Sequence, residues 1–251
     1  MLYRRAWCAL HGAGLTSDQR ALLWRILHGV LRVGAFGCYV APSLPLEAAY
    51  CTAPCCDGRR VVETLSHAFV ACPAARPALE WLCDLWQAIS PGNRPPMDAQ
   101  VLLAGDYRVW RPRAPEGDSD ILWMRLRASV LQGIWRVRCR RTLYVDGAAP
   151  APALAAAAVM LAIEEIVSAL QRDWLRVERG AGIVTESGLP VSWFRGRHLP
   201  LEEDAFKKIW AIGGVLCSVL PGGPAAEGAP ASGRLHLRLH PGWRVVPVPG
   251  L

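Results

Sequence analysis

Five side chains between positions 51 and 72 are of the types that bind transition metals: Cys51, Cys55, Cys56, His67 and Cys72. Structural zinc sites hold the ion with four thiolate or imidazole ligands arranged as a tetrahedron. Three residues separate Cys51 from Cys55 and four separate it from Cys56, and either spacing lets one turn of the chain bring two sulfurs to one metal. The pattern therefore predicts a structural Zn²⁺ bound by Cys51, Cys56, His67 and Cys72, with Cys55 competing with Cys56.

A catalytic zinc keeps one coordination position open for water and commonly has a carboxylate nearby that carries protons. Four protein ligands would fill every position of the metal, and Glu63 is the candidate carboxylate. The order of ligands also differs from the zinc deaminase signature, in which a His and a Glu precede the cysteine pair. We therefore expect no catalytic residue and no enzymatic activity.

The segment 63–71 is expected to form a short helix, because its apolar residues repeat at a helical spacing. Side chains five positions apart point about 140° away from each other in a straight helix, so such a helix would separate His67 from Cys72. Pro73 disfavours a helical conformation at the residue before it. We expect the chain to leave the helix at Cys72 and to return that sulfur towards the imidazole.

Apolar residues at helical spacing predict the helices that must position this cluster. The expected helices cover residues 17–36, 74–89, 119–145, 154–177 and 202–212. The alternating sequence RLHLRLH at 234–240 predicts a peripheral strand without an obvious partner. The expected fold class is mainly α, with a small zinc-stapled helical domain, a helical segment and an irregular C-terminal tail.

Stretches rich in proline and glycine divide the expected organisation into four parts. The sequence PGNRPP at 91–96 ends the second helix. The expected parts are a helical zinc-binding domain at 1–96, a linker at 97–118, a basic helical segment at 119–178 and an irregular, partly flexible tail at 179–251.

The chain has 28 Lys and Arg against 21 Asp and Glu, a net charge of +7, and all but two of the cations are Arg. The planar guanidinium matches phosphate geometry, so this excess favours a nucleic-acid partner, with base-composition bias of the coding sequence as the alternative. In the helix expected at 119–145, arginines flank an apolar stripe. The residues predicted to contact the phosphates of RNA or DNA are Arg125, Arg127, Arg136, Arg138, Arg140 and Arg141, together with Arg4, Arg5, Arg20, Arg25 and Arg32.

LLWRILHGVLRVGAFGCYV, the cysteine pair and VETLSHAFVACPAARPALEWL follow one another over about residues 17–90. This order resembles the zinc-binding region that follows the reverse transcriptase in LINE-like, non-LTR retrotransposons. The matching residues are Trp24, Gly29, Cys51 with Cys55 or Cys56, Glu63 and Thr64, His67 with Phe69, Cys72 and Pro73, and Trp81. The family usually separates its first two cysteines by two residues, whereas three or four separate them here. Residues 119–141 resemble, more loosely, the helix that follows the zinc region.

The resemblance implies a non-catalytic, zinc-binding segment of a retroelement polyprotein that holds RNA or DNA, with other retroelement proteins as further partners. The chain contains neither the paired aspartates of a polymerase palm nor an endonuclease motif. TLYVDGAA at 142–149 resembles the first strand of ribonuclease H. An Ala-rich stretch follows Asp146 where that fold requires a glycine-containing second strand, so we expect no nuclease activity. The alternative function is a structural or protein-interaction module whose zinc only holds helices together.

The sequence also predicts a cellular compartment. The start MLYRRAWCALHGAG has a short apolar stretch that is broken by His11 and Gly12, unlike a secretory signal. Clustered cysteines in a reducing compartment indicate metal binding more than disulfides. The uncharged runs 147–163 and 209–226 fall short of the roughly 20 strongly apolar residues that a spanning helix needs. We expect an intracellular protein, nuclear or cytoplasmic, without a membrane contact.

Overall fold

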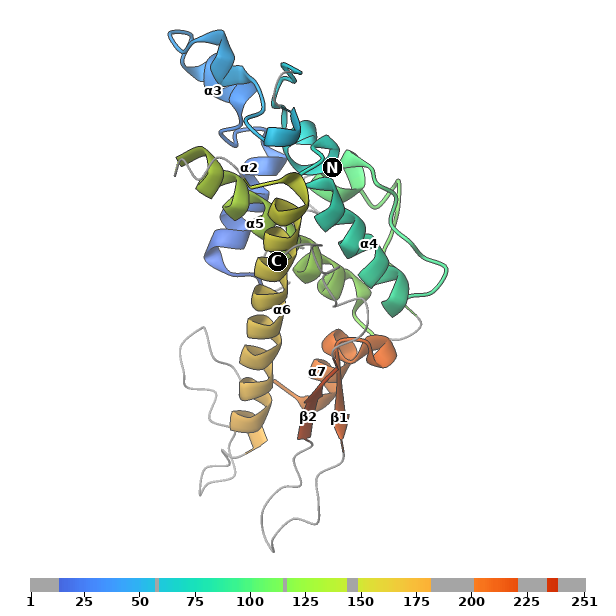
Figure 1. The fold of residues 1–251 in the computed structure, drawn as a ribbon. Coiled ribbons are helices and arrows are strands. Elements are labelled where there is room, and N and C mark those ends of the chain that lie inside the picture. The colour runs from blue at the N-terminus through green and yellow to red at the C-terminus, as the bar shows by residue number, and fades with distance from the viewer. Residues whose placement is uncertain are drawn as a thin grey trace, which may run out of the picture.

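The computed structural model describes residues 14–56, 59–114, 117–143, 149–181, 201–220 and 234–238. Its helices are α2 (Ser17–Leu27), α3 (Gly34–Val40), α4 (Arg76–Ile89), α5 (Ser119–Leu143), α6 (Ala151–Ala181) and α7 (Glu203–Trp210). Its short 3₁₀ or π turns are η1 (Leu46–Ala49), η2 (Pro54–Cys56), η3 (His67–Ala71), η4 (Gln100–Ala104) and η5 (Ile212–Gly214), and its strands are β1 (Cys217–Leu220) and β2 (Arg234–Leu237). The mainly α class is confirmed, with the two long helices α5 and α6 packed together in the middle (Figure 1).

The first expected helix, 17–36, is shorter in the structure and ends at Leu27. Gly29 adopts a left-handed conformation with φ of 66°, and the N–H of the next residue donates back to the carbonyl of Arg25 (3.0 Å). This arrangement closes the end of a helix and is strongly favoured by glycine. The chain therefore leaves the helix here, and α3 starts anew at Gly34.

Helix α5 is the centre of the fold and contacts α2, α4, α6 and α7. Every residue from Leu122 to Ile134 is buried, including the apolar stripe expected from the sequence. At Gly133 the backbone of α6 lies so close that a Cβ atom would be 2.3 Å from the carbonyl oxygen of Ala158. A glycine is therefore required for α5 and α6 to cross at this distance.

The buried face of helix α6 includes most of the apolar stripe expected from the sequence. Val159, Leu170 and Trp174 are buried, whereas Ile163 and Val167 are only half-buried. The buried face also includes Ala158, Ala162 and Ile166. Small side chains such as those of the two alanines allow the two helix backbones to approach each other.

By length and composition alone, Ala151–Glu178 of α6 is apolar enough to cross a membrane, with a mean hydropathy of 2.0. Core helices of soluble proteins meet the same criterion. In the structure α6 packs against α4, α5 and α7, and 39% of its most apolar stretch is buried inside the fold. The length and hydropathy of α6 are therefore only weak evidence for a membrane contact. The expectation that the protein has no membrane contact stays a prediction.

Part of the stretch expected as a linker, residues 97–118, packs into the core. The turn η4 buries Val101, Leu102 and Leu103. Trp110 packs edge-on against one tryptophan of α4 and one of α5, with ring centroids 6.1 and 4.8 Å away. One hydrophobic cluster thus includes residues of α2, α4, α5, α6 and α7. The division of the chain into four parts stays a prediction.

Of the tail expected at 179–251, the structure describes the end of α6 and residues 201–220 and 234–238. This part contains α7 and an antiparallel strand pair in which Cys217 of β1 lies opposite Leu237 of β2. The strand expected from the alternating sequence therefore has β1 as its partner. Residues 182–200, 221–233 and 239–251 lie outside the described part of the chain, as do Asp146, Arg4 and Arg5.

A buried carboxylate joins three helices. Asp173 of α6 accepts hydrogen bonds from Arg125 of α5, from the indole N–H of Trp210 of α7 (3.0 Å) and from Arg176 (3.0 Å). Burial alone would raise the pKa of Asp173, but the charge and hydrogen bond of Arg125 and the Trp210 N–H hold it below its usual range. The Arg125 guanidinium also lies over the Trp210 ring, 4.8 Å from its centroid.

Asp173→Asn is expected to lower the free energy of unfolding by about 3–5 kcal/mol at neutral pH, because it removes the carboxylate charge with which Arg125 pairs in the interior. The folded pKa of Asp173 is lower than that of an unfolded aspartate, about 3.9. Its contribution is therefore fully present above that value and is lost as the pH falls through the folded pKa. Urea unfolding followed at neutral pH and at about pH 3 measures both effects.

The control for this experiment is Asp84→Asn. Asp84 pairs with Arg94 at 2.5 Å on the surface, with 64% of its side chain exposed. Exposed pairs contribute about 0–1 kcal/mol. Equal losses of stability in the two variants would contradict a central role for the Asp173 network.

Candidate metal centre

A short antiparallel ladder fixes Cys51 at the start of a loop. The N–H of Cys51 donates to the carbonyl of Val61 (2.8 Å), and the N–H of Glu63 donates to the carbonyl of Ala49 (2.8 Å). These bonds close the loop 51–61 at its base. The sulfur of Cys51 is therefore held next to the residues that the loop carries.

Within this loop the 3₁₀ turn η2 directs Cys56 inward. The N–H of Cys56 donates to the carbonyl of Ala53 (2.8 Å), and Cys56 is 4% exposed, whereas Cys55 is half-buried. Consecutive side chains in a 3₁₀ turn point about 120° apart, because the turn has about 3.0 residues. Two neighbouring cysteines therefore cannot both face the same interior point.

His67 and Cys72 are brought together by a π turn, η3. The N–H of Cys72 donates to the carbonyl of His67 across five positions (2.7 Å), and the His67 N–H donates to the hydroxyl of Thr64 (3.1 Å). The wider π ring returns residue 72 to the side of residue 67, which a straight α-helix would not do. Cys72 itself is extended, with φ of −65° and ψ of 127°, as expected for a residue before proline.

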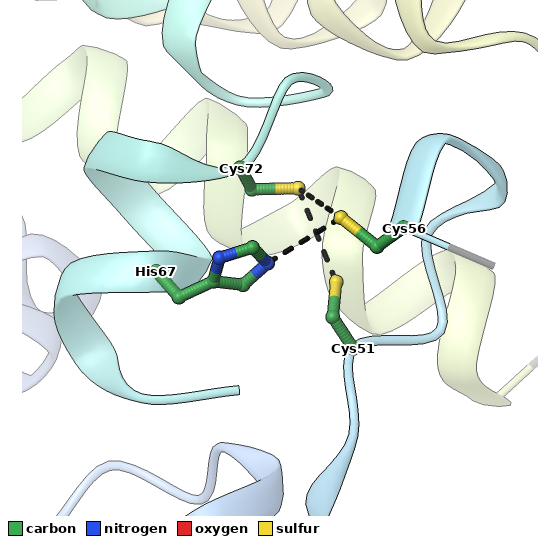
Figure 2. Close-up of side chains that lie close together, drawn as sticks. All are labelled: Cys51, Cys56, His67 and Cys72. Atoms are coloured by element: carbon green, nitrogen blue, oxygen red, sulfur yellow. Dashed lines mark hydrogen bonds between the residues drawn. The ribbon is translucent and has the colours of Figure 1, made fainter. Parts of the chain in front are cut away.

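The four donor groups converge on one point, as Figure 2 shows. The Cys72 sulfur lies 4.0 Å from those of Cys51 and Cys56, and Nε2 of His67 lies 3.5 Å from the Cys56 sulfur. All four donor atoms are within 4.8 Å of one another. In a tetrahedron with Zn–S of about 2.3 Å and Zn–N of about 2.0–2.1 Å, sulfurs are about 3.8 Å apart and sulfur and nitrogen about 3.6 Å apart. The donor set therefore has the dimensions to hold a metal ion.

The thiols of the centre are not joined by disulfides. Cys51, Cys56 and Cys72 are free, and the Cys72 sulfur lies 4.0 Å from the other two, about twice the length of a disulfide bond. Cys55 is also free and lies 4.0 Å from the Cys56 sulfur, but it is not part of the group of four. Of the two competing cysteines, the structure thus brings Cys56 to the centre.

The pKa values of the three thiols are shifted in different directions. A hydrogen bond from Cys72 lowers the pKa of Cys51 to about 5. Burial, together with the neighbouring Cys51 thiolate, raises the pKa of Cys56 to about 12. The hydrogen bond to Cys51 and burial likewise raise the pKa of Cys72. One thiolate is favoured in the absence of a cation, since a second would lie beside the first. A divalent cation offsets that repulsion and displaces the remaining protons.

Glu63 is buried beside the centre, and both of its carboxylate oxygens accept hydrogen bonds. Arg138 of α5 donates from Nε to Oε1 (2.9 Å) and from Nη2 to Oε2 (2.5 Å), and the Gly34 N–H donates to Oε2 (2.9 Å). Burial alone would raise the pKa of Glu63, but the hydrogen bonds and charge of Arg138 hold it below its usual range. A Cβ on Gly34 would lie 2.7 Å from the carbonyl oxygen of Ala49, so glycine permits this close contact. Sequence reasoning missed the Glu63–Arg138 contact, because a pair 75 positions apart leaves no local pattern.

Two of the arginines predicted to contact phosphate lie in the interior. Arg125 is 7% exposed and pairs with Asp173, while Arg127 is 2% exposed and donates to the carbonyls of Leu102 and Leu103 (3.3 and 3.1 Å). Burial lowers the pKa of Arg127 to about 10, so it keeps its charge at neutral pH. Because other elements surround α5, the prediction of phosphate contacts is corrected for Arg125 and Arg127.

The remaining arginines of α5 differ in exposure. Arg136 forms an ion pair with Glu165 at 2.7 Å, and Arg138 forms one with Glu63. The Arg141 side chain is 9% exposed. Arg140 is the exposed one of the six. Near the end of α5, Arg140 is thus exposed, whereas Arg138 and Arg141 lie beside Glu63.

Cys56→Ser is expected to abolish stoichiometric metal binding, and the matched variant Cys55→Ser is expected to leave it intact. The reason is that Cys56 and not Cys55 lies with the other three donors. The purified full-length variants are dialysed against Zn²⁺ and their metal content is determined by elemental analysis. Absorption of the Co²⁺-loaded proteins in the thiolate charge-transfer region reports the number of sulfur ligands. Equal metal content in the two serine variants would show that the assignment is wrong.

The chain was also compared with known proteins. No family model, no curated protein and no solved structure matches it. The interpretation of the centre therefore rests on the identity of its donor atoms, on their distances and on the elements that hold them.

Proposed function

We propose that the chain is a non-catalytic, zinc-stabilised segment of a retroelement reverse transcriptase polyprotein that binds RNA or DNA. The observation that carries this proposal is the convergence of Cys51, Cys56, His67 and Cys72 within 4.8 Å, in the order that the resemblance leads us to expect. Three thiolates and one imidazole are a donor set that suits Zn²⁺. A zinc ion held there supplies a crosslink between the loop 51–61 and the π turn.

The surroundings of the centre favour a structural role for the metal. Four protein donors complete a tetrahedron, which leaves no position for a water. The carboxylate of Glu63 is engaged by Arg138 and by the backbone of Gly34, so it is not placed to carry a proton at the metal. Structural zinc supplies roughly 10–16 kcal/mol of apparent folding free energy in small sites. The metal would therefore stabilise the fold around it.

A surface on α2 supports a nucleic-acid contact. Trp24 is 38% exposed and its ring stacks on that of His28, with centroids 4.4 Å apart and an interplanar angle of 22°. Arg25 is exposed on the same face, because positions three and four apart are neighbours on a helix. Arg32, also exposed, follows shortly after the helix. We call Trp24, Arg25 and His28 the α2 patch; it combines a cation for phosphate with an aromatic ring for an unpaired base.

Arg25→Gln is expected to weaken the binding of the zinc-loaded chain to single-stranded RNA. The slope of log K against log salt should decrease by about 0.7, the contribution of one phosphate contact on a single strand. Trp24→Ala should cost about 1–3 kcal/mol of binding to single strands, because stacking is lost, and less on a duplex. Gel-shift titrations between about 50 and 200 mM salt measure both effects.

The matched control is Arg76→Gln. Arg76 is exposed like Arg25, but its charge is paired with Glu80 on the same helix at 2.8 Å. Its replacement should leave the salt slope unchanged. If the unaltered chain fails to bind at low salt, or binds with an affinity that salt does not change, the nucleic-acid role is refuted.

A structural or protein-interaction module is the second candidate, and one observation favours it. We call α3 and η1 together the apolar arm; α3 projects from the body at the end opposite the strands (Figure 1), and none of its residues is buried. Tyr39 and Leu46 of this arm are 82% and 67% exposed. Exposed apolar clusters commonly mark protein contacts. A zinc-loaded chain that binds neither RNA nor DNA at low salt would favour this candidate.

A further inference from the structure

A cavity lies at the end of the body that carries α7 and the strands (Figure 1). Its volume is about 650 Å³, within the range of about 300–1,000 Å³ that is usual for small-molecule sites. Its walls come from the end of α4, from Gly117 ahead of α5, from the segment between α7 and β1, and from Arg238 just after β2. Of the residues that form the metal centre and the α2 patch, none lines it. The cavity is therefore a separate candidate site.

The lining of this cavity is basic. It includes Lys207, Lys208 and Arg238, and none of the described residues that line it is an Asp or a Glu. Lys207 is paired with Glu203 of the same helix at 2.6 Å. Lys208 and Arg238 are exposed, and within the described part of the chain neither forms an ion pair. Two positive charges at the cavity thus remain available for an anion.

The backbone at both cations is anchored by the fold. The carbonyl of Lys208 accepts a hydrogen bond from the Asp118 N–H (2.8 Å), and a Cβ on Gly117 would lie 2.2 Å from this carbonyl oxygen. Gly117, with φ of 102°, therefore permits the end of α7 to dock at the start of α5. The Arg238 N–H donates to the carbonyl of Leu216 (3.0 Å). The elements that surround the cavity thus hold the two charged residues in place.

The rest of the lining is mainly apolar. It includes Ile89 of α4, Ile212 of η5 and Val219 of β1. Ser218 also lines the cavity, and its hydroxyl oxygen is buried without a hydrogen-bond partner among the described residues. Most buried side-chain polar atoms have such a partner. An apolar wall with a few cations and one unpartnered hydroxyl is a typical composition for the site of a small amphipathic molecule.

We propose that this cavity binds a phosphate monoester with an apolar body. A phosphate monoester carries about −1.5 to −2 charges at pH 7, which matches the two positive charges of Lys208 and Arg238. The planar guanidinium of Arg238 suits two phosphate oxygens, and the Lys208 ammonium acts as a point charge. The apolar body of the ligand packs against Ile89, Ile212 and Val219, where the burial of apolar surface adds to binding. This site does not rest on the proposed function.

The test uses the full chain with phenyl phosphate as the probe. Inorganic phosphate, which lacks the apolar body, and phenol, which lacks the phosphate, are the control compounds. Isothermal titration calorimetry at neutral pH measures affinity and stoichiometry. One phenyl phosphate should bind per chain, at least about tenfold more tightly than either control compound, because the site holds both parts of the ligand. Lys208→Gln and Arg238→Gln should each weaken binding about tenfold or more, the loss expected for one charge-assisted hydrogen bond.

The matched control variant is Arg234→Gln. Arg234 lies at the other end of β2, is exposed like Arg238 and is not one of the lining residues. Its replacement should change the affinity by less than about threefold, because solvent and salt screen a distant exposed charge. Ser218→Ala should weaken binding by a factor of about 2–10, because a neutral hydrogen bond is lost.

Thermal unfolding followed by circular dichroism checks that each variant keeps the fold, and Lys208→Gln decides the matter if Arg238→Gln does not. The proposal is overturned if phenyl phosphate fails to bind the unaltered chain at millimolar concentration, or binds no more tightly than inorganic phosphate. Unchanged affinity in Lys208→Gln and Arg238→Gln would place the anion elsewhere and overturn it too. Equal losses in Arg234→Gln and Arg238→Gln have the same meaning, since binding would then follow net charge and not the cavity.

Discussion

The complete burial of α5 from Leu122 to Ile134 is the constraint on which the rest of the structure depends. A central helix that carries arginines must provide their guanidinium groups with counter-charges or hydrogen-bond acceptors inside the protein, because a buried charge without a partner is strongly destabilising. Arg125 pairs with Asp173, which also accepts a hydrogen bond from an indole N–H. Arg127 donates to the carbonyls at the end of η4, and Arg138 donates two hydrogen bonds to one carboxylate. The surrounding elements are thereby held to α5 by hydrogen bonds as well as by apolar contact.

The metal centre depends on two departures from regular secondary structure. The η2 turn selects one of two adjacent cysteines, and the π turn η3 brings together two ligands that an α-helix would separate. The π turn is braced by the fold behind it, since the Phe69 ring within η3 stacks on Trp135 of α5 with ring centroids 6.2 Å apart. A site made of four short side chains thus derives its dimensions from contacts with a helix that contributes no ligand.

Sequence patterns predicted the elements better than their arrangement. Periodicity located α4, α5 and α6, and the number and order of Cys and His residues pointed to the four groups that converge. The same patterns could not show that arginines beside an apolar stripe are enclosed, because this depends on how many elements surround α5. They also undervalued alanine in α6 and the apolar residues of η4, since close helix approach and packing of a Pro-rich stretch are set by tertiary contacts. The contact between Glu63 and Arg138 is of the same kind, because it is visible only in three dimensions.

The separation of Glu63 and Arg138 by 75 positions has a consequence for the order of events during synthesis. All four donor residues of the centre lie between Cys51 and Cys72, so they leave the ribosome well before the helix that supports them. At about 5–20 residues per second, Arg138 follows Glu63 by about 4 to 15 s. For that interval the π turn that carries His67 lacks the helix against which it packs in the finished protein. A nascent chain would therefore hold a metal ion less tightly than the finished protein, and completion of α5 would act as the step that retains it.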